Sequence, residues 1–287
     1  MPELPEVETM RRGVLGIVGG CVEQLHWLRR PLKTITTQPV RPVFRRRAVG
    51  QSIVAVDRIG KRVVIRLGAG DSIVVEPRMT GLLLLNEPPN QLHLRWHMRL
   101  SGSAVSDVWY WDRRGLGSIR LFSQETLHQV LGPDRIGPDA LTITPKVLQN
   151  QFAASRREVK VALLDQRRLA GMGNLYASEV LHVARIHPGT PCDRLRPDDW
   201  RNLHRSMRRI LRQAIAHEGS TLSDGTYRNA LNQSGNYQNH HRVYGRAGLP
   251  CMTCHSARIV RVVQAQRSTF YCPACQKNRR SRSRIRK

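Results

Sequence analysis

The sequence contains no long apolar run, and its N-terminus has no hydrophobic signal-peptide core. A membrane-spanning helix needs about 18 or more apolar residues in succession, and no segment approaches that length. Acidic residues are also scarce: 21 Asp and Glu stand against 47 Lys and Arg, which leaves a net charge of +26. We therefore expect no membrane anchorage and a polyanionic partner, for which nucleic acid is the first candidate.

An anionic membrane surface is the alternative partner, but no strongly amphipathic basic helix with an aromatic face supports it. Hydrophobic residues make up 40% of the chain, which is typical of a folded protein. A length of 287 residues suits two domains and a small additional unit better than one large core. We expect a monomer that is cytoplasmic and associated with the nucleoid.

Cysteine is limited to six residues, four of which form two CxxC pairs separated by seventeen residues. Thiolates at this spacing form a closed tetrahedral zinc site with no coordination position left for a substrate water. We predict one structural Zn²⁺. Two disulfides are the alternative, but nothing else in the chain indicates secretion. The remaining Cys21 and Cys192 are expected to be small core residues. The predicted ligands are Cys251, Cys254, Cys272 and Cys275.

The segment between the cysteine pairs is typical of a β-hairpin. Its two predicted strands cover residues 258–263 and 268–271, and Arg267 lies at or near their turn. A hairpin of this size is too small to fold alone, so the metal would stabilise it. Arg267 would then be a cation on a rigid tip.

The first half of the chain changes from a helical to a strand pattern. Apolar residues at three- and four-residue spacings predict an amphipathic helix over 3–18, which Pro2 introduces. From about 51 to 122 the period becomes two, and the number of strands favours an antiparallel β-sandwich or barrel. The predicted strands are 52–56, 62–67, 72–76, 82–85, 93–100 and 118–122.

A linker predicted over 132–145 precedes a helical region. One helix begins at Val159, a second covers 175–183, and a third runs from Trp200 to Ile215.

The turn Gly171-Met-Gly-Asn174 opens onto the second helix, where backbone N–H groups can bind a phosphate. An ordinary helix–helix turn is the alternative, and the basic charge favours phosphate. Residues 279–287 contain six basic side chains and predict a disordered tail. That tail would add nonspecific DNA affinity or only solvated charge.

The N-terminal segment has two interpretations. Carboxylates in the first turn suit the helix dipole, which explains Glu3, Glu6 and Glu8 structurally. The alternative depends on position, because removal of Met1 would leave Pro2 as a terminal secondary amine. An α-amino group with a pKa near about 8 is neutral in about one-tenth of molecules at pH 7, so it can act as a nucleophile.

Five segments together resemble the formamidopyrimidine-DNA glycosylase family, in order and over essentially the whole chain. The resemblance implies an α+β protein with an N-terminal β-sandwich and leading helix over 1–131. A helix-two-turn-helix domain over 132–240 and a zinc-finger hairpin over 241–278 would follow, before the tail at 279–287. The five segments are Pro2-Glu-Leu-Pro-Glu-Val-Glu, Gly173-Asn-Leu-Tyr-Ala-Ser-Glu, Ile186-His-Pro, Val243-Tyr-Gly-Arg and Gln266-Arg-Ser-Thr-Phe-Tyr-Cys272.

The resemblance also implies an activity. The chain would be a bifunctional DNA glycosylase and abasic-site lyase of base excision repair, acting on duplex DNA with oxidised purines, such as 8-oxoguanine and formamidopyrimidines. Pro2 would attack the anomeric carbon, and the resulting iminium would promote β- and δ-elimination. Glu3 would protonate the sugar ring oxygen, and Glu6 would position the nucleotide or the terminus. Lys61 matches a lysine that holds a phosphate near the lesion.

Further residues match DNA-binding positions of the family. Lys160, Asn174 and Arg267 correspond to phosphate-binding positions, although a solvated surface explains the lysines equally well in isolation. A second group falls where the family inserts side chains into the gap left by a flipped base. That group is Met79, Arg114 and Leu116, of which Met79 alone would also suit a core position.

The sequence departs from the family pattern at several places. Leu116 stands in place of Phe, and Glu76-Pro-Arg78 replaces a His-Leu-Gly run. The segment 223–238, where the family holds the extruded base, also differs, and the spacer between the cysteine pairs is one residue longer.

Two other functions stay open. One is an endonuclease VIII-like enzyme for oxidised pyrimidines, against which Leu4 argues because that group usually has Gly there. The other is a noncatalytic lesion-binding protein, against which intact Pro2 and Glu3 argue.

Overall fold

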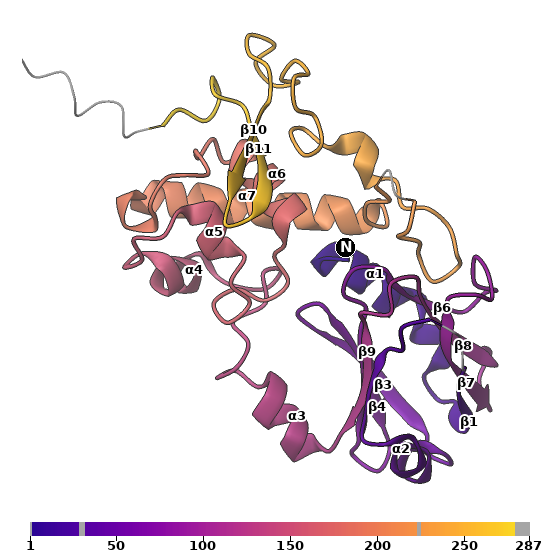
Figure 1. The fold of residues 1–287 in the computed structure, drawn as a ribbon. Coiled ribbons are helices and arrows are strands. Elements are labelled where there is room, and N and C mark those ends of the chain that lie inside the picture. The colour runs from indigo at the N-terminus through magenta and orange to yellow at the C-terminus, as the bar shows by residue number, and fades with distance from the viewer. Residues whose placement is uncertain (1, 29–31, 223–224, 279–287) are drawn as a thin grey trace, which may run out of the picture. The chain divides into compact units, whose positions relative to one another are not determined.

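The computed structural model describes residues 2–28, 32–222 and 225–278. The chain forms two compact units (Figure 1): Met1–Arg135 with Ala214–Gln238, and Ile136–Gln213 with Asn239–Lys287. Met1 and the predicted tail at 279–287 lie outside the described residues. None of the helices within the described ranges is long and apolar enough to cross a membrane.

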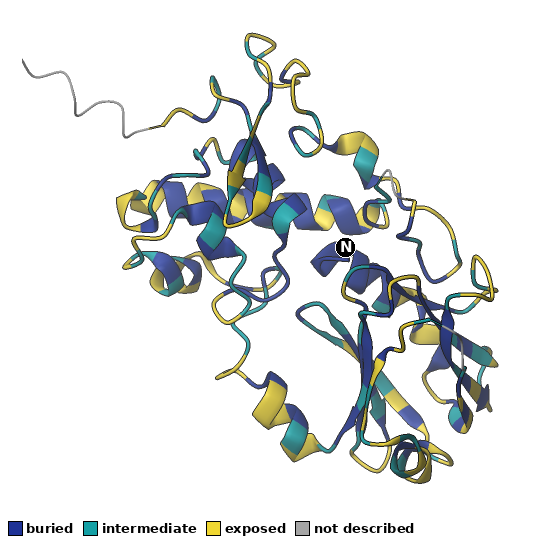
Figure 2. Ribbon diagram, in the orientation of Figure 1, coloured by how far each residue is buried: buried dark blue, intermediate teal, exposed yellow. Residues whose placement is uncertain are grey.

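The first unit is a β-sandwich whose two sheets share one hydrophobic core. One sheet has the strand order β1-β7-β8-β6 and the other β2-β9-β5-β4-β3. Neighbouring strands are antiparallel except β2 and β9, which are parallel. Figure 2 shows long buried stretches on these strands. The strands are β1 Cys21–Trp27, β2 Thr36–Gln38, β3 Ile53–Ile59, β4 Arg62–Leu67, β5 Ser72–Glu76, β6 Gly81–Leu84, β7 Leu94–Ser101, β8 Asp107–Asp112 and β9 Ser118–Phe122.

All six predicted strands are present, as β3 to β7 and β9, with ends shifted by three residues or fewer. Three strands were not predicted. In β1 a register shift between Val22 and Gln24 breaks the alternation of buried and exposed residues. In β8 the four consecutive residues 108–111 are all apolar, so the sequence shows no apolar–polar alternation although the burial alternates over 107–110.

The leading helix α1 is shorter than predicted. It covers Leu4–Gly13, and a 3₁₀ turn, η1 Leu15–Ile17, follows it. Pro2 precedes the N-cap residue Glu3, so it lies outside the helix. Gly13 lies against Ala230, and a Cβ at position 13 would come within 2.4 Å of the Ala230 Cβ. The end of α1 thus packs directly on residues that come more than 200 positions later in the chain.

Helices α2 Arg41–Ala48 and α3 Gln124–Leu131 complete the regular structure of the first unit. Residues 214–238 also belong to it, because Tyr227 and Ala230 lie in the sandwich core. The Leu85 N–H donates to the Ala230 carbonyl at 2.8 Å.

The second unit is helical and carries the predicted hairpin. The three predicted helices are present. A further helix, α4, was not predicted; it begins at the last residue of the predicted linker. Its start has a recognisable signal, since the Thr144 hydroxyl caps the helix and Pro145 is its first residue. The elements are α4 Pro145–Phe152, α5 Val159–Leu163, α6 Asn174–Val183, η2 Cys192–Arg194, α7 Pro197–Ala216, η3 Tyr237–His240, β10 Val260–Gln264 and β11 Arg267–Tyr271; η3 starts in the first unit, which also takes the last three residues of α7.

Helix α7 packs its apolar side on the rest of the second unit. Trp200 stacks on Phe152 of α4, with ring centroids 6.2 Å apart. His204 forms a 2.8 Å hydrogen bond with the Ile143 carbonyl. Strand β11 packs on α6, so the hairpin is held by the same helix that follows the predicted glycine turn.

Candidate functional site

The N-terminus of α1 is fixed by a reciprocal capping box. The Glu3 backbone N–H donates to Glu6 Oε2 at 2.9 Å, while the Glu3 side chain accepts from the Glu6 backbone. Glu6 Oε1 accepts a second bond of 2.9 Å from the Ser220 N–H. Both carboxylates are only 3% exposed. The structural interpretation therefore holds for Glu3 and Glu6, and Glu6 also anchors the segment that follows α7.

A pocket opens beside buried Pro2. The Tyr227 hydroxyl on its wall donates to the Glu6 carbonyl at 3.4 Å. Burial, with the nearby Glu6 charge, raises the pKa of Tyr227 well above its ordinary value, so the hydroxyl stays protonated. Gly219, at a φ of +81°, lies so close that a Cβ there would be 2.9 Å from Glu6 Cγ. The pocket is lined by Pro2, Met79, Thr80, Leu82, Ser220, Leu222, Thr226 and Tyr227.

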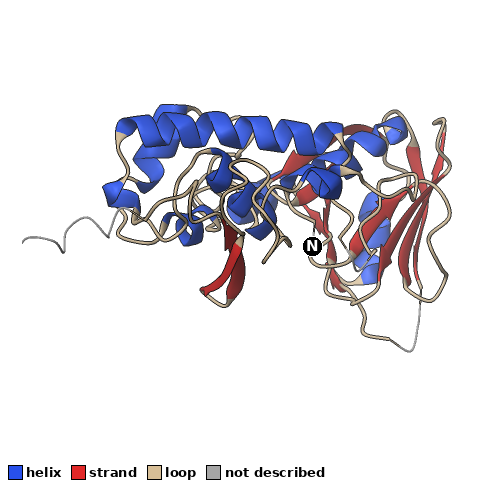
Figure 3. Cartoon of the chain, turned by 90° about the horizontal axis from the view of Figure 1, so that it is seen from above, coloured by secondary structure: helices blue, strands red, loops and turns tan. Residues whose placement is uncertain are grey.

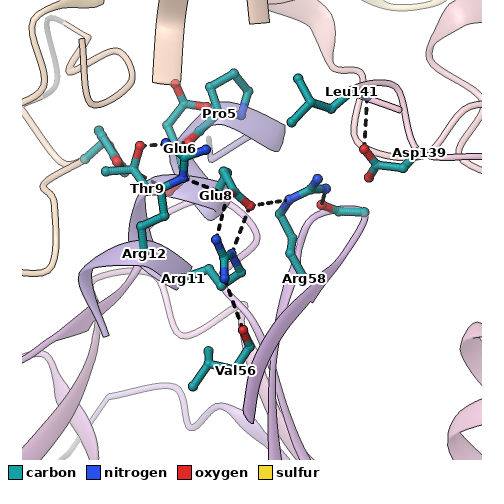
Figure 4. Close-up of polar contacts among 12 residues, drawn as sticks. Pro5, Glu6, Glu8, Thr9, Arg11, Arg12, Val56, Arg58, Asp139 and Leu141 are labelled. Atoms are coloured by element: carbon teal, nitrogen blue, oxygen red, sulfur yellow. Dashed lines mark hydrogen bonds and ion pairs between the residues drawn. The ribbon is translucent and has the colours of Figure 1, made fainter. Parts of the chain in front are cut away.

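Glu8 connects α1 to the strand pair that carries Lys61 (Figure 4). Its carboxylate accepts hydrogen bonds from Arg11 and Arg12 and from Arg58 on β3. Burial alone would raise the pKa of Glu8, but the hydrogen bonds from these three arginines outweigh it and lower the pKa to about 2. Lys61 lies next to Gly60 in the two-residue turn between β3 and β4. The Gly60 carbonyl accepts a hydrogen bond from the Arg58 guanidinium.

Asp112 joins the two segments that carry the predicted wedge residues. It is fully buried, and Oδ1 accepts from the Thr80 hydroxyl at 2.5 Å and from the Arg114 N–H at 3.1 Å. Oδ2 accepts from the Gly117 N–H at 2.8 Å. Met79 is half-buried in the pocket wall. The Asp112 carboxylate thus fixes the backbone on both sides of the turn 113–116 beside the pocket segment.

The predicted wedge side chains differ in exposure. Arg114 is exposed and Leu116 is half-buried. Arg78, which replaces a family glycine, adopts a φ of +50°, a conformation that non-glycine residues rarely take. Its side chain is 61% exposed, so the departure from the family adds a solvent-facing cation next to Met79.

The second unit brings Lys160, Asn174 and the hairpin together. The Lys160 ammonium donates to Asn174 Oδ1 at 2.5 Å, and Asn174 Nδ2 donates to the Ser268 carbonyl at 3.0 Å. Lys160 is fully buried, so it supports Asn174 rather than forming part of the surface. Arg267, the residue before Ser268, is exposed and begins β11 directly after a turn, as predicted.

Glu179 explains why two of the family segments occur together. Its buried carboxylate accepts backbone N–H bonds of 2.8 to 2.9 Å from Arg242, Val243 and Tyr244. Burial raises the pKa of Glu179 even though these bonds act in the opposite direction. Helix α6 therefore holds both Asn174 at its start and the segment that leads into the hairpin.

The four predicted metal ligands form one cluster. All four sulfur atoms lie within 4.8 Å of one another. The Cys251–Cys275 and Cys254–Cys272 sulfur pairs are 3.9 and 3.7 Å apart. A tetrahedral zinc with bonds of about 2.3 Å requires sulfur atoms about 3.8 Å apart, so the cluster fits one Zn²⁺. The four thiols are free in the structure, and the sulfur separations of 3.7 and 3.9 Å are those of a metal cluster and longer than a disulfide bond of about 2.05 Å.

The other two cysteines differ in burial. Cys192 is fully buried, as expected, and burial raises the pKa of its thiol to about 11. Cys21 is half-buried at the start of β1.

Several residues of this site were missed in the sequence. Ser220 and Tyr227 line the pocket, and Thr80 and Asp112 order its rim. Glu179 lay within a quoted family segment, but its role had no signal in spacing alone. Gly219, directly before Ser220, is a residue type that could have indicated the close backbone approach seen here.

Comparisons with known proteins agree along the chain. Family models match residues 1–119 as a formamidopyrimidine-DNA glycosylase N-terminal domain, residues 131–226 as the H2TH domain of that enzyme, and residues 248–278 as a zinc finger found in FPG and IleRS.

The curated formamidopyrimidine-DNA glycosylase of Chloroflexus aggregans is 40% identical, over 96% of this chain and 98% of the relative. The crystal structure of the Thermus thermophilus MutM (Fpg) protein matches with a TM-score of 0.82 at 35% identity, covering 96% of this chain and 98% of the other. A Lactococcus lactis Fpg mutant in complex with DNA containing Fapy-dG matches with a TM-score of 0.83 at 30% identity, covering 96% and 100%.

The fold and the site thus define a DNA-repair glycosylase class with a zinc finger, in which a β-sandwich is joined to an H2TH domain. Within that class the chain belongs to the formamidopyrimidine-DNA glycosylase family.

Proposed function

We propose that this chain is a bifunctional DNA glycosylase and abasic-site lyase that removes oxidised purines with Pro2 as nucleophile. The observation that carries the proposal is the position of Pro2 in the wall of a pocket, directly before the capped and buried Glu3. A nucleophile next to a proton-transferring group is the arrangement that covalent catalysis needs. Met1 lies outside the described residues, and its removal is part of the proposal.

The proposed reaction forms one covalent intermediate. The Pro2 nitrogen bonds to the anomeric carbon while the bond to the damaged base breaks and the base leaves with a proton. Glu3 donates a proton to the sugar ring oxygen, so the ring opens and a cationic iminium remains. Loss of a proton from the adjacent carbon expels the 3′ phosphate, and a second elimination expels the 5′ phosphate.

The remaining residues hold the DNA in the proposed complex. Asn174 and Arg267 contact phosphates, and Lys160 acts through Asn174, because Lys160 itself is buried. Lys61 holds a phosphate from the β3–β4 turn. Met79, Arg114 and Leu116 fill the gap left by the flipped nucleotide, which offsets part of an extrusion cost of a few kcal/mol.

Borohydride trapping tests the nucleophile. The protein with Met1 removed should be captured covalently on DNA that contains an abasic site or 8-oxoguanine. Pro2→Gly, or an uncleaved N-terminal extension, should abolish capture. Glu3→Gln should bind lesion DNA but lose base excision. Capture of the N-terminally blocked protein at the normal rate would transfer the nucleophile to a lysine, with Lys61 as the first candidate.

A base-excision panel tests the lesion class. No charged side chain is among the lining residues of the pocket, and the expected purine preference depends on the family resemblance. We expect excision of 8-oxoguanine and formamidopyrimidines to exceed that of oxidised pyrimidines. The reverse order would favour the endonuclease VIII-like alternative, and binding without excision would favour a noncatalytic protein. We further propose that the chain acts as a monomer at the nucleoid.

A further inference from the structure

Helix α7 carries a stripe of five arginines on one side, of which four are exposed and Arg208 is half-buried. At about 100° per residue, the five positions fall within about 100° of the helix circumference. The opposite side is the buried one, with apolar residues such as Leu203, Met207 and Ile210. Figure 2 shows buried and exposed positions alternating along α7. The arginine stripe consists of Arg201, Arg205, Arg208, Arg209 and Arg212.

Most of the arginine stripe has no counter-charge. Arg201 pairs with Asp198, one turn earlier. Within the described parts of the chain, Arg205, Arg209 and Arg212 form no ion pair or side-chain hydrogen bond. Like charges three and four residues apart destabilise a helix. The arginine stripe therefore does not serve the stability of the helix, and its charge is available to a partner.

The arginine stripe and the zinc hairpin occupy opposite sides of the second unit. Seen from above, α7 runs along one side and the hairpin of β10 and β11 projects from the other (Figure 3). In Figure 1 the hairpin lies in front of α7, with α5 and α6 also in front of that helix. The buried side of α7 packs on the core that carries the hairpin, so the arginine stripe and the hairpin face different sides of the second unit.

We propose that the arginine stripe binds a second segment of duplex DNA, without sequence preference, while the hairpin side holds the first. Arg201 and Arg212 are separated by about 17 Å along the helix axis. A duplex carries one negative charge per about 1.7 Å with both strands counted, so a segment of this length contains about ten phosphates.

The composition of the arginine stripe favours duplex DNA over single-stranded nucleic acid and membrane surfaces as the partner. No aromatic side chain lies among its residues, and single strands and membrane surfaces are usually bound with the help of aromatic residues. A chain that contacts two duplex segments can pass from one to the other without free diffusion. The assignment of the first segment to the hairpin side depends on the proposed function, whereas the arginine stripe itself does not.

A two-duplex binding experiment tests the proposal with the full chain. The protein is first saturated with an unlabelled duplex that contains an abasic-site analogue. A dye-labelled undamaged duplex is then titrated in, and mass photometry counts the duplexes on each protein copy. The test variant is Arg205→Gln/Arg209→Gln/Arg212→Gln. The control Arg41→Gln/Arg46→Gln/Arg99→Gln removes the same charge from the first unit.

The wild type and the control should bind two duplexes per copy. The test variant should bind the second at least tenfold more weakly, with the log–log salt slope reduced by about 2.7 for three lost contacts. Its affinity for the first duplex should change less than twofold.

The proposal would be overturned by one duplex per wild-type copy, by an unchanged second affinity in the test variant, or by stronger binding of single strands or anionic vesicles to the arginine stripe. Equal loss of both duplexes would place the arginine stripe on the lesion-binding side and would also overturn it. Excision assayed on the same variant reports separately on the proposed function.

Discussion

The Thr80 hydroxyl donates a 2.5 Å hydrogen bond to Asp112, and the same Asp112 oxygen accepts from the Arg114 backbone. This relationship joins the residue after Met79 to the turn that presents Arg114 and Leu116. Because the carboxylate is fully buried, its geometry is set inside the sandwich and not by DNA. The proposed wedge is therefore preorganised, which lowers the entropic cost of inserting it into a base stack.

Asp112→Asn should loosen this preorganised wedge. The substitution replaces one Asp112 carboxylate oxygen, which accepts hydrogen bonds, with an amide NH₂ group, which donates them. We therefore expect a loss of about 1–3 kcal/mol in the free energy of unfolding. Excision of paired 8-oxoguanine should fall about tenfold, while borohydride trapping on abasic DNA falls less, because an abasic nucleotide is easier to extrude. Thr80→Ser keeps the hydroxyl and serves as the control. Equal losses on both substrates would show that Asp112 acts only on stability.

Glu8 should make the stability of the protein fall in acid. Its folded-state pKa is about 2, against an ordinary value of 4.5. A lowered carboxyl pKa stabilises the folded state above about pH 4.5, and this contribution is lost as the pH falls toward 2. Glu8→Gln should cost about 1–2 kcal/mol at pH 7 after allowance for solvent screening, and the difference should shrink below pH 4.5.

Urea unfolding at several pH values measures this effect. Glu23→Gln is the matched control, because Glu23 forms a 3.6 Å ion pair with Arg99 at the exposed surface. It should change the free energy of unfolding by less than about 1 kcal/mol. A Glu8→Gln difference that is constant from pH 7 to 2.5 would contradict the assigned pKa.

Removal of zinc should unfold the hairpin that carries Arg267. The finger is too small to fold without its metal, and the Ser268 carbonyl that Asn174 and Lys160 contact lies on it. Native mass spectrometry should find one zinc per chain. Chelation or Cys272→Ser should weaken duplex binding at least tenfold and speed hydrogen exchange in 258–271.

The strands of the sandwich should keep their protection against exchange when zinc is removed. Cys21→Ser, outside the cluster, is the control and should retain zinc and DNA affinity. Full affinity in a zinc-free protein would refute the structural role of the metal.

The arginine stripe should lower the stability of the folded protein. Replacing Arg205, Arg209 and Arg212 with Gln removes five like-charge pairs at three- or four-residue spacings, each worth roughly 0.2–0.5 kcal/mol. Gln and Arg have similar helix propensities, so we expect the variant to be more stable by about 1 kcal/mol in low salt. Thermal unfolding at low and high salt measures the gain, which should shrink as salt screens the repulsion. A less stable variant would mean that these side chains have structural contacts.

The zinc ligands, the sandwich strands and the family were predictable from sequence because each depends on local spacing or on ordered motifs. Two thiol pairs at this spacing predict a metal site, and short runs of β-branched residues bounded by turns, such as β4 and β5, predict strands. The strands β1 and β8 were missed because a bulge in β1 and an unbroken apolar run in β8 remove the alternation from the sequence.

The sequence by itself determined the fold class, the metal and the N-terminal nucleophile and carboxylate as candidates. Only the tertiary structure decided which side chains surround them. Ser220 comes 214 positions after Glu6 and Asp112 comes 32 after Thr80, and no local pattern encodes such contacts. Burial also separated residues that look alike in the sequence, since Lys160 is enclosed as a support for Asn174 while Arg267 remains exposed. Long-range packing fixes both distance and solvent access, and these set what each charge can do.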